Sequence, residues 1–260
     1  SLFGGGTDYP DWYEKNSGQV ISATINKYSF ITARYLPPFF KYNHRVSYFK
    51  NEAVKKISDI KHPSVRETLK FLKFKNGIEI VHNADLPARS GLGSSSTFTV
   101  GLLNSLCALD SHVCSKRELA TKSIFIEQKL IKENVGSQDQ VAAAFGGLNK
   151  ISFSKNKLFE VSPIVLKKTR LNELENNLLL FFTGFARNAS EIAKYQIQSI
   201  NKKYEELTQI NSIAEHGYQV LNSRSNLNEI GQLLNEQWQI KKSLTKKITS
   251  DKIDNMYDAG

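Results

Sequence analysis

The stretch of sequence that decides the fold is Leu86-Pro87-Ala88-Arg89-Ser90-Gly91-Leu92-Gly93-Ser94-Ser95-Ser96. Alternating apolar residues over 77–83 predict a strand before it, and the apolar periodicity of 98–109 predicts a helix after it. The stretch is therefore a glycine- and serine-rich turn that opens a helix. Such a turn suits a phosphate group, because glycines let the backbone approach closely and the first helical N–H groups lack internal partners. The helix dipole adds to the attraction.

Two familiar phosphate-binding patterns do not fit this turn. A Walker loop needs Lys directly after its last glycine, but here the last glycine, Gly93, is followed by Ser94. A dinucleotide fingerprint needs Gly or Ala where Ser96 stands. A plain strand-to-helix turn capped by serine has the same composition. The turn by itself therefore leaves a phosphate site and a structural turn both open.

A second glycine-rich turn opens the sequence, within Ser1-Leu2-Phe3-Gly4-Gly5-Gly6-Thr7-Asp8-Tyr9-Pro10. Its three glycines leave the backbone accessible, and the Asp8 carboxylate can accept hydrogen bonds from hydroxyl groups. A tight structural turn is the alternative. The first residues, Ser1-Leu2-Phe3, are typical of the end of an apolar strand. We therefore expect a further segment upstream.

A carboxylate, Glu127, lies in the second helix after the serine-rich turn. Ser115 and Glu118 form a capping box that predicts the start of this helix. The position of Glu127 near the apolar residues of the helix indicates a carboxylate at the edge of the core. By itself Glu127 is equally an exposed helix charge or a partner of a lysine such as Lys122 or Lys132.

Asp139 lies in a further Gly/Ser turn, residues 134–140, which precedes a short helix over 141–145. Phosphoryl transfer needs a cation to screen the phosphates and a group that orients or deprotonates the attacking hydroxyl. Carboxylates serve both needs. Glu127 and Asp139 are therefore candidates for these two tasks.

The chain resembles the GHMP kinases, the family of galactokinase, homoserine kinase, mevalonate kinase and phosphomevalonate kinase. The run Pro87-x-x-x-Gly91-Leu92-Gly93-Ser94-Ser95-Ser96 closely resembles the family's ATP-binding motif. The Gly-Gly-Gly-Thr-Asp turn is similar to the first motif of the heptose and fucose kinase branch. Glu127, followed about a dozen residues later by Asp139, matches the family's magnesium-binding glutamate and the aspartate of its Gly-x-x-Asp-type turn.

The resemblance implies a role for each matching residue. Asp139 would be the catalytic base, or would orient the acceptor hydroxyl and balance charge instead. Mg²⁺ would be held by Glu127 and the hydroxyl of Ser95, with Ser94 as the second choice. The residues implied to bind ATP are Pro87, Arg89, Gly91, Leu92, Gly93, Ser94, Ser95 and Ser96. Those implied to bind the acceptor are Gly5, Gly6, Thr7, Asp8, Tyr9, Gly184 and Arg187. For Arg187, an exposed ion pair is the alternative.

The fold implied by the resemblance is a two-domain α+β fold. Its N-terminal domain, with the ATP-binding loop, would span residues 1–169, and its C-terminal ferredoxin-like domain would span 170–260. Within the chain, 148–161 predicts a hairpin, and the continuous apolar run 178–182 predicts a strand buried on both faces. The family's third, glycine-rich motif is not reached by residue 260, so we expect the sequence to be truncated at both ends.

The implied reaction is transfer of the γ-phosphoryl group of ATP to a sugar hydroxyl. The triple-glycine turn favours the anomeric hydroxyl of D-glycero-D-manno-heptose 7-phosphate. The alternatives are a kinase for a free sugar such as fucose, galactose or a uronic acid, and a non-catalytic RNA-binding or regulatory module. The net charge of +10 fits a phosphorylated acceptor and also leaves room for the module. Intact carboxylates at residues 8, 127 and 139 argue against the module.

Composition sets outer limits on function. With 40% hydrophobic and 23% charged residues, the 260-residue chain is an ordinary globular protein, expected in the cytoplasm. No run approaches about 20 apolar residues, so we expect no membrane partner. Lysine runs such as Lys241-Lys242 indicate solvated helix faces, and we expect no nucleic-acid partner; a homodimer is left open. Cys107 and Cys114 are expected to be packing thiols, and five scattered histidines indicate no structural metal site.

Overall fold

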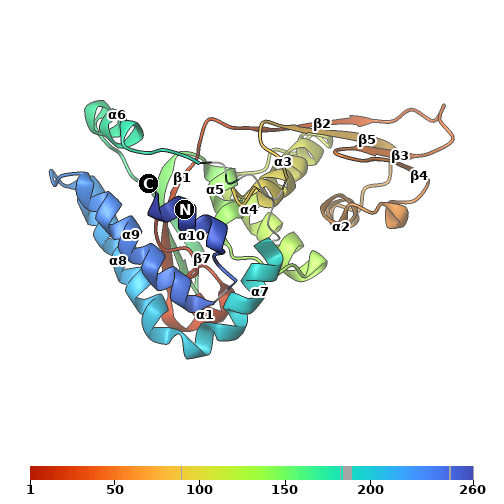
Figure 1. The fold of residues 1–260 in the computed structure, drawn as a ribbon. Coiled ribbons are helices and arrows are strands. Elements are labelled where there is room, and N and C mark those ends of the chain that lie inside the picture. The colour runs from red at the N-terminus through yellow and green to blue at the C-terminus, as the bar shows by residue number, and fades with distance from the viewer. Residues whose placement is uncertain (89, 182, 184–188, 246, 260) are drawn as a thin grey trace. The chain divides into compact units, whose positions relative to one another are not determined.

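The computed structural model describes residues 1–88, 90–181, 183, 189–245 and 247–259. Contacts divide the chain into two compact units, each of which contains one sheet. The first comprises residues 1–24, 136–138 and 146–260, and the second comprises 25–135 and 139–145. Figure 1 labels the elements of both. The predicted domain division at residues 169 and 170 remains a prediction.

The first unit combines a three-stranded antiparallel sheet with helices. Its strands are β1 (Gly18–Ala23), β6 (Leu148–Ser154) and β7 (Leu158–Pro163), in the order β1-β6-β7. Its helices are α1 (Pro10–Asn16), α6 (Lys168–Asn176), α7 (Ala189–Ser199), the short 3₁₀ helix η3 (Ile200–Lys202), α8 (Tyr204–Asn222), α9 (Asn228–Leu244) and α10 (Asp251–Asp258). The predicted hairpin is confirmed, since β6 and β7 pair from Asn149–Pro163 to Ser154–Leu158.

The core of the first unit lies between the long helices and the first residues of the chain. Leu221 of α8 and Ile230 of α9 pack in one buried cluster with Phe3 and Ile21. A Cβ on Gly217 would lie 2.7 Å from the Phe3 ring, so glycine is required where α8 approaches it. The glycine-rich turn after Phe3 is thereby anchored on a rigid part of this unit.

The predicted strand over 178–182 is wrong in its described part. Residues 178–181 have no regular structure, and the side chains of Leu179, Leu180 and Phe181 are 80%, 68% and 76% exposed. Phe182 lies outside the described residues. A continuous apolar run favours burial but does not supply a pairing strand. No described strand of the β1-β6-β7 sheet pairs with this segment.

The second unit contains a four-stranded mixed sheet. Its strands are β2 (Ser29–Tyr35), β3 (His44–Ser47), β4 (Asn51–Val54) and β5 (Ile78–Ala84), in the order β2-β5-β3-β4. Its helices are the 3₁₀ helix η1 (Ile57–Asp59), α2 (Pro63–Phe71), α3 (Ser94–Leu109), α4 (Lys116–Phe125), the π-helix η2 (Ile126–Ile131) and α5 (Gln138–Phe145). The α+β class is thus confirmed.

The predicted strand–turn–helix of the serine-rich motif is confirmed as β5, a turn, and α3. Leu102 and Leu106 of α3 share a buried cluster with Ile78 and Ile80 of β5. The helix begins four residues earlier than the apolar periodicity indicates, because Gly93 is its N-cap in a left-handed conformation. The serine-rich turn is therefore held between a buried strand and a buried helix.

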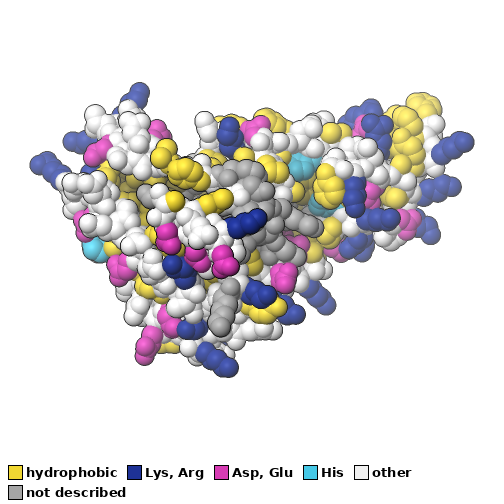
Figure 2. Space-filling view, viewed as in Figure 1, with side chains coloured by type: hydrophobic (Ala, Val, Ile, Leu, Met, Phe, Trp, Pro, Cys, Tyr) yellow, Lys and Arg dark blue, Asp and Glu magenta, His cyan; other side chains and the backbone are white. Residues whose placement is uncertain are grey.

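Lys and Arg side chains occur at many places on the face drawn in Figure 2. Within the described residues, no helix has the length and apolar character needed to cross a membrane.

Candidate active site

The serine-rich turn lies against the Asp139 side chain within the second unit. Gly91 and Gly93 have φ values of 79° and 71°, a region that favours glycine. A Cβ on Gly93 would lie 3.2 Å from Cγ of Asp139, which is an exposed residue in the first turn of α5. Glycine at this position therefore permits both the turn and the close approach of a carboxylate.

Glu127 is fully buried in the π-helix η2 and is hydrogen-bonded from both motif-bearing helices. Ser96, in the first turn of α3, donates a 2.8 Å hydrogen bond from Oγ to Oε2 of Glu127. Gln140, in the first turn of α5, donates from Nε2 to the same oxygen. Single-turn π-helices often occur at functional sites. Glu127 is thus neither an exposed charge nor the partner of Lys122, which pairs with Glu118 at 2.9 Å.

The surroundings of Glu127 leave one of its carboxylate oxygens available to a ligand. Burial raises the pKa of Glu127 to about 7, although hydrogen bonds from neighbouring side chains act in the opposite direction. Its Oε1 atom is buried and has no hydrogen-bond partner among the described residues. A divalent cation would supply both a charge and a partner, and Mg²⁺ prefers oxygen ligands. The residues around Glu127 therefore fit Mg²⁺.

The serine in contact with Glu127 is Ser96, whereas sequence reasoning chose Ser95 as the metal-binding hydroxyl. Ser95 is exposed and Ser94 is half-buried, and Ser96 is 4% exposed. The role predicted for Ser95 remains a prediction. Gln140 was missed; its signal was its place one residue after Asp139, on the first turn of the same helix.

The turn that contains Asp8 is tightly held within the first unit. Oδ1 of Asp8 accepts from the Gly6 N–H at 3.0 Å, and Oδ2 accepts from the Gln138 N–H at 3.2 Å. Asp8 is 1% exposed, and a Cβ on Gly136 would lie 1.8 Å from its Oδ2. The carboxylate therefore fixes the turn against residues 136–138. Its predicted contact with sugar hydroxyls remains a prediction.

Other hydrogen bonds fix the ends of the same turn. The Thr7 hydroxyl donates to the carbonyl oxygen of Gly4 at 2.9 Å. Buried Gln237 of α9 accepts from the Gly4 N–H at 2.7 Å and donates to the Leu2 carbonyl at 3.0 Å. Sequence reasoning missed Gln237; a glutamine within an apolar helix stripe was the available signal. The Tyr9 hydroxyl donates to Gln196 at 2.9 Å.

A pocket adjoins the serine-rich turn in the second unit. Its lining includes Lys27, Tyr28, Leu92, Ser94 and Thr97. Tyr28 and Leu92 are 60% and 45% exposed, so they offer apolar surface beside the turn. Sequence reasoning did not select Tyr28. Three predicted contact residues, Arg89, Gly184 and Arg187, lie outside the described residues.

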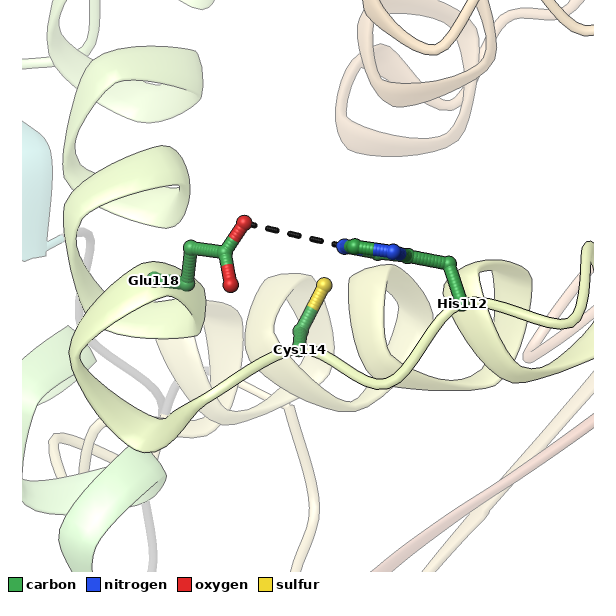
Figure 3. A group of neighbouring side chains, drawn as sticks. All are labelled: His112, Cys114 and Glu118. Carbon is green, nitrogen blue, oxygen red and sulfur yellow. Dashed lines mark ion pairs between the residues drawn. The ribbon is translucent and has the colours of Figure 1, made fainter.

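Figure 3 shows another polar group in the second unit, formed by His112, Cys114 and Glu118. The potential ligand atoms of these residues all lie within 4.8 Å of one another. Glu118, however, closes the capping box with Ser115 and pairs with Lys122. The Cys114 thiol donates to Sγ of Cys107 at 2.9 Å, in keeping with packing thiols. Helix capping and ion pairing therefore account for this group.

Comparison with known proteins shows which proteins the chain is similar to. Residues 55–147 match the family described as GHMP kinases N terminal domain, a segment that includes the serine-rich turn, Glu127 and Asp139. A D-glycero-alpha-D-manno-heptose 7-phosphate kinase of Campylobacter jejuni is 27% identical over 98% of the chain and 78% of its own length. The chain is thus similar to GHMP kinases, and its residues 55–147 match the N-terminal domain of that family. The magnesium and ATP roles implied by the resemblance remain predictions.

Solved structures of GHMP kinases share the fold of this chain. A D-glycero-D-manno-heptose 1-phosphate kinase from Bacteroides thetaiotaomicron superposes with a TM-score of 0.77 at 25% identity, covering 93% of this chain and 76% of that one. A Lactococcus lactis galactokinase complexed with galactose gives a TM-score of 0.65 at 19% identity, covering 97% and 75%. The predicted two-domain GHMP fold is confirmed.

Proposed function

We propose that this chain is a GHMP kinase that transfers the γ-phosphoryl group of ATP to a hydroxyl of a heptose phosphate, with the anomeric hydroxyl of D-glycero-D-manno-heptose 7-phosphate as the preferred acceptor. The observation that carries the proposal is the grouping of two carboxylates beside the serine-rich turn. Ser96 contacts Glu127, and Gly93 lies against Asp139. A plain structural turn requires neither carboxylate.

ATP binds to the serine-rich turn through its phosphates. The unpaired N–H groups at the start of α3 donate to phosphate oxygens, and the dipole of this 16-residue helix favours the negative charge. The neighbouring pocket receives the adenine base, because the exposed faces of Tyr28 and Leu92 offer it stacking and apolar contact. Lys27, in the lining of the same pocket, adds positive charge.

The two carboxylates have separate tasks. Glu127 and a serine hydroxyl of the turn would hold Mg²⁺, which would screen the phosphate charges. The buried site keeps Glu127 oriented through Ser96 and Gln140. Asp139 is exposed and accepts the proton of the attacking hydroxyl, or orients that hydroxyl for attack.

A phosphorylated heptose is supported as acceptor by the names of two relatives and by the charge of the chain. The Campylobacter jejuni and Bacteroides thetaiotaomicron proteins are both named as heptose phosphate kinases. The net charge of +10 favours an anionic acceptor. A free sugar is the second candidate, because an Arabidopsis thaliana bifunctional fucokinase/GDP-fucose pyrophosphorylase is 24% identical over 70% of the chain, although this covers 18% of that protein.

The test is magnesium-dependent ADP release from ATP, measured with heptose 7-phosphate and with a panel of fucose, galactose and uronic acids. We expect turnover on the heptose phosphate and little on the free sugars. Turnover on a free sugar, without turnover on heptose 7-phosphate, would show that the proposed acceptor is wrong and that the free sugar is the substrate. Absence of turnover with every sugar, together with tight salt-dependent RNA binding, would support the non-catalytic module instead.

A further inference from the structure

Lys241 points into the first unit, so the prediction of a solvated Lys241-Lys242 face is wrong for this residue. Lys241 lies on α9 and is half-buried, and its Nζ atom is 3.0 Å from the position that a Cβ on Gly5 would take. Lys242, in contrast, lies over the rings of Trp238 and Tyr257, 5.9 Å from each centroid. Adjacent lysines of one helix thus have different surroundings.

Gln138 approaches Gly5 from another segment of the same unit. Its Nε2 atom lies 3.5 Å from the same Cβ position, and the Ser1 hydroxyl lies 3.0 Å from it. The Oε1 atom of Gln138 is buried and has no hydrogen-bond partner among the described residues. The structure also gives Lys241 no hydrogen bond or ion pair within the described part of the chain. The ammonium group of Lys241 and the amide group of Gln138 therefore flank a residue that lacks a side chain.

The charges around Gly5 favour a neutral polar ligand group. Burial lowers the pKa of Lys241, while the charge of nearby Asp8 raises it. The positive charge of Lys241 and the negative charge of Asp8 therefore offset each other near Gly5. A hydroxyl oxygen can accept from an ammonium group and from an amide N–H at the same time.

We propose that Lys241 and Gln138 bind one hydroxyl group of the sugar acceptor above Gly5. Nζ of Lys241 and Nε2 of Gln138 both donate hydrogen bonds to the hydroxyl oxygen. The inference rests on the proposed sugar kinase function and names the residues that recognise the acceptor. Gly5 belongs to the site because a Cβ there would take up the space of the hydroxyl group.

The test measures acceptor binding by calorimetry without ATP and steady-state kinetics with ATP, on the full chain. The probes are heptose 7-phosphate, the unphosphorylated heptose and its monodeoxy analogues. The variants are Lys241→Met, Gln138→Met and Gly5→Ala, and the matched controls are Lys242→Met and Gly231→Ala, where an added Cβ meets nothing within 4 Å. Circular dichroism melts check that each variant is folded, and Lys241→Arg tests whether another donor restores binding.

Each of the three site variants is expected to raise the Kd and KM for the acceptor about tenfold or more, because a buried hydrogen bond is lost. The KM for ATP and both controls should match the wild type. One monodeoxy analogue should bind wild type and variants equally weakly. Unchanged acceptor binding in folded Lys241→Met would overturn the inference, as would a loss confined to the phosphorylated sugar. If the wild type neither binds nor phosphorylates any sugar, both the proposed function and this inference are wrong. If the wild type turns over normally and the three site variants match it, only this inference is wrong.

Discussion

Replacing Glu127 with glutamine should change how the stability of the protein depends on pH. The pKa of Glu127 is raised from 4.5 to about 7 by burial. Between these values the folded state holds a proton that the unfolded state has released, so the free energy of unfolding falls as pH rises. By pH 8 the loss amounts to about 3 kcal/mol relative to pH 4, because each pKa unit corresponds to about 1.4 kcal/mol. Glutamine cannot titrate, so Glu127→Gln should lack this loss.

The assay is urea unfolding at several pH values between 4 and 8, without magnesium, for wild type and Glu127→Gln. Glu175→Gln, which changes an exposed glutamate of α6, serves as the control and should follow the wild type. Added magnesium should stabilise the wild type increasingly as pH rises through 7, because the ionised carboxylate binds the cation. It should not stabilise Glu127→Gln. Parallel pH profiles for wild type and variant would refute the buried-carboxylate account.

Two glycine substitutions test the other contacts of the site. Gly93→Ala should lower turnover at least tenfold, because the added methyl group would displace the Asp139 side chain. The control is Gly146→Ala, since Gly146 has a similar φ of 68° and an added Cβ there meets nothing within 4 Å. This control should keep wild-type turnover. Both carry the strain of a left-handed alanine, about 1 kcal/mol in urea unfolding, so equal losses of turnover would point to strain alone. Gly136→Ala would place a Cβ 1.8 Å from Oδ2 of Asp8 and should destabilise the fold by about 3 kcal/mol or more; a melting temperature close to wild type would contradict this.

Local signals in the sequence predicted the elements that carry the site. The β5–turn–α3 arrangement follows from alternation, glycines and helical period, which all act over a few residues. The capping box of Ser115 and Glu118 is present as predicted, since both of its hydrogen bonds form within four residues of chain. The roles of the two carboxylates came from the resemblance to the family, and they remain predictions.

Features that depend on distant segments could not be predicted in this way. The burial of Glu127 depends on α3 and α5, whose side chains reach it from 31 and 13 residues away in sequence. Helical period could not decide which of Lys241 and Lys242 points inward, because that depends on the position of Gly5. The apolar run at 178–181 indicated burial, but a strand also needs a partner, and sequence composition does not provide one.

The most direct test of the central claim is phosphoryl transfer from ATP to heptose 7-phosphate by wild type and Asp139→Asn, with the sugar product identified by ³¹P NMR. Asparagine keeps the size of the side chain and removes the proton acceptor and the charge. The proposal predicts magnesium-dependent formation of a heptose bisphosphate by wild type and a fall in kcat of about 10²- to 10⁴-fold in the variant, the usual contribution of a positioned base. Equal turnover by both proteins would contradict the role of Asp139 in the reaction, and no product from the wild type would contradict the proposed function.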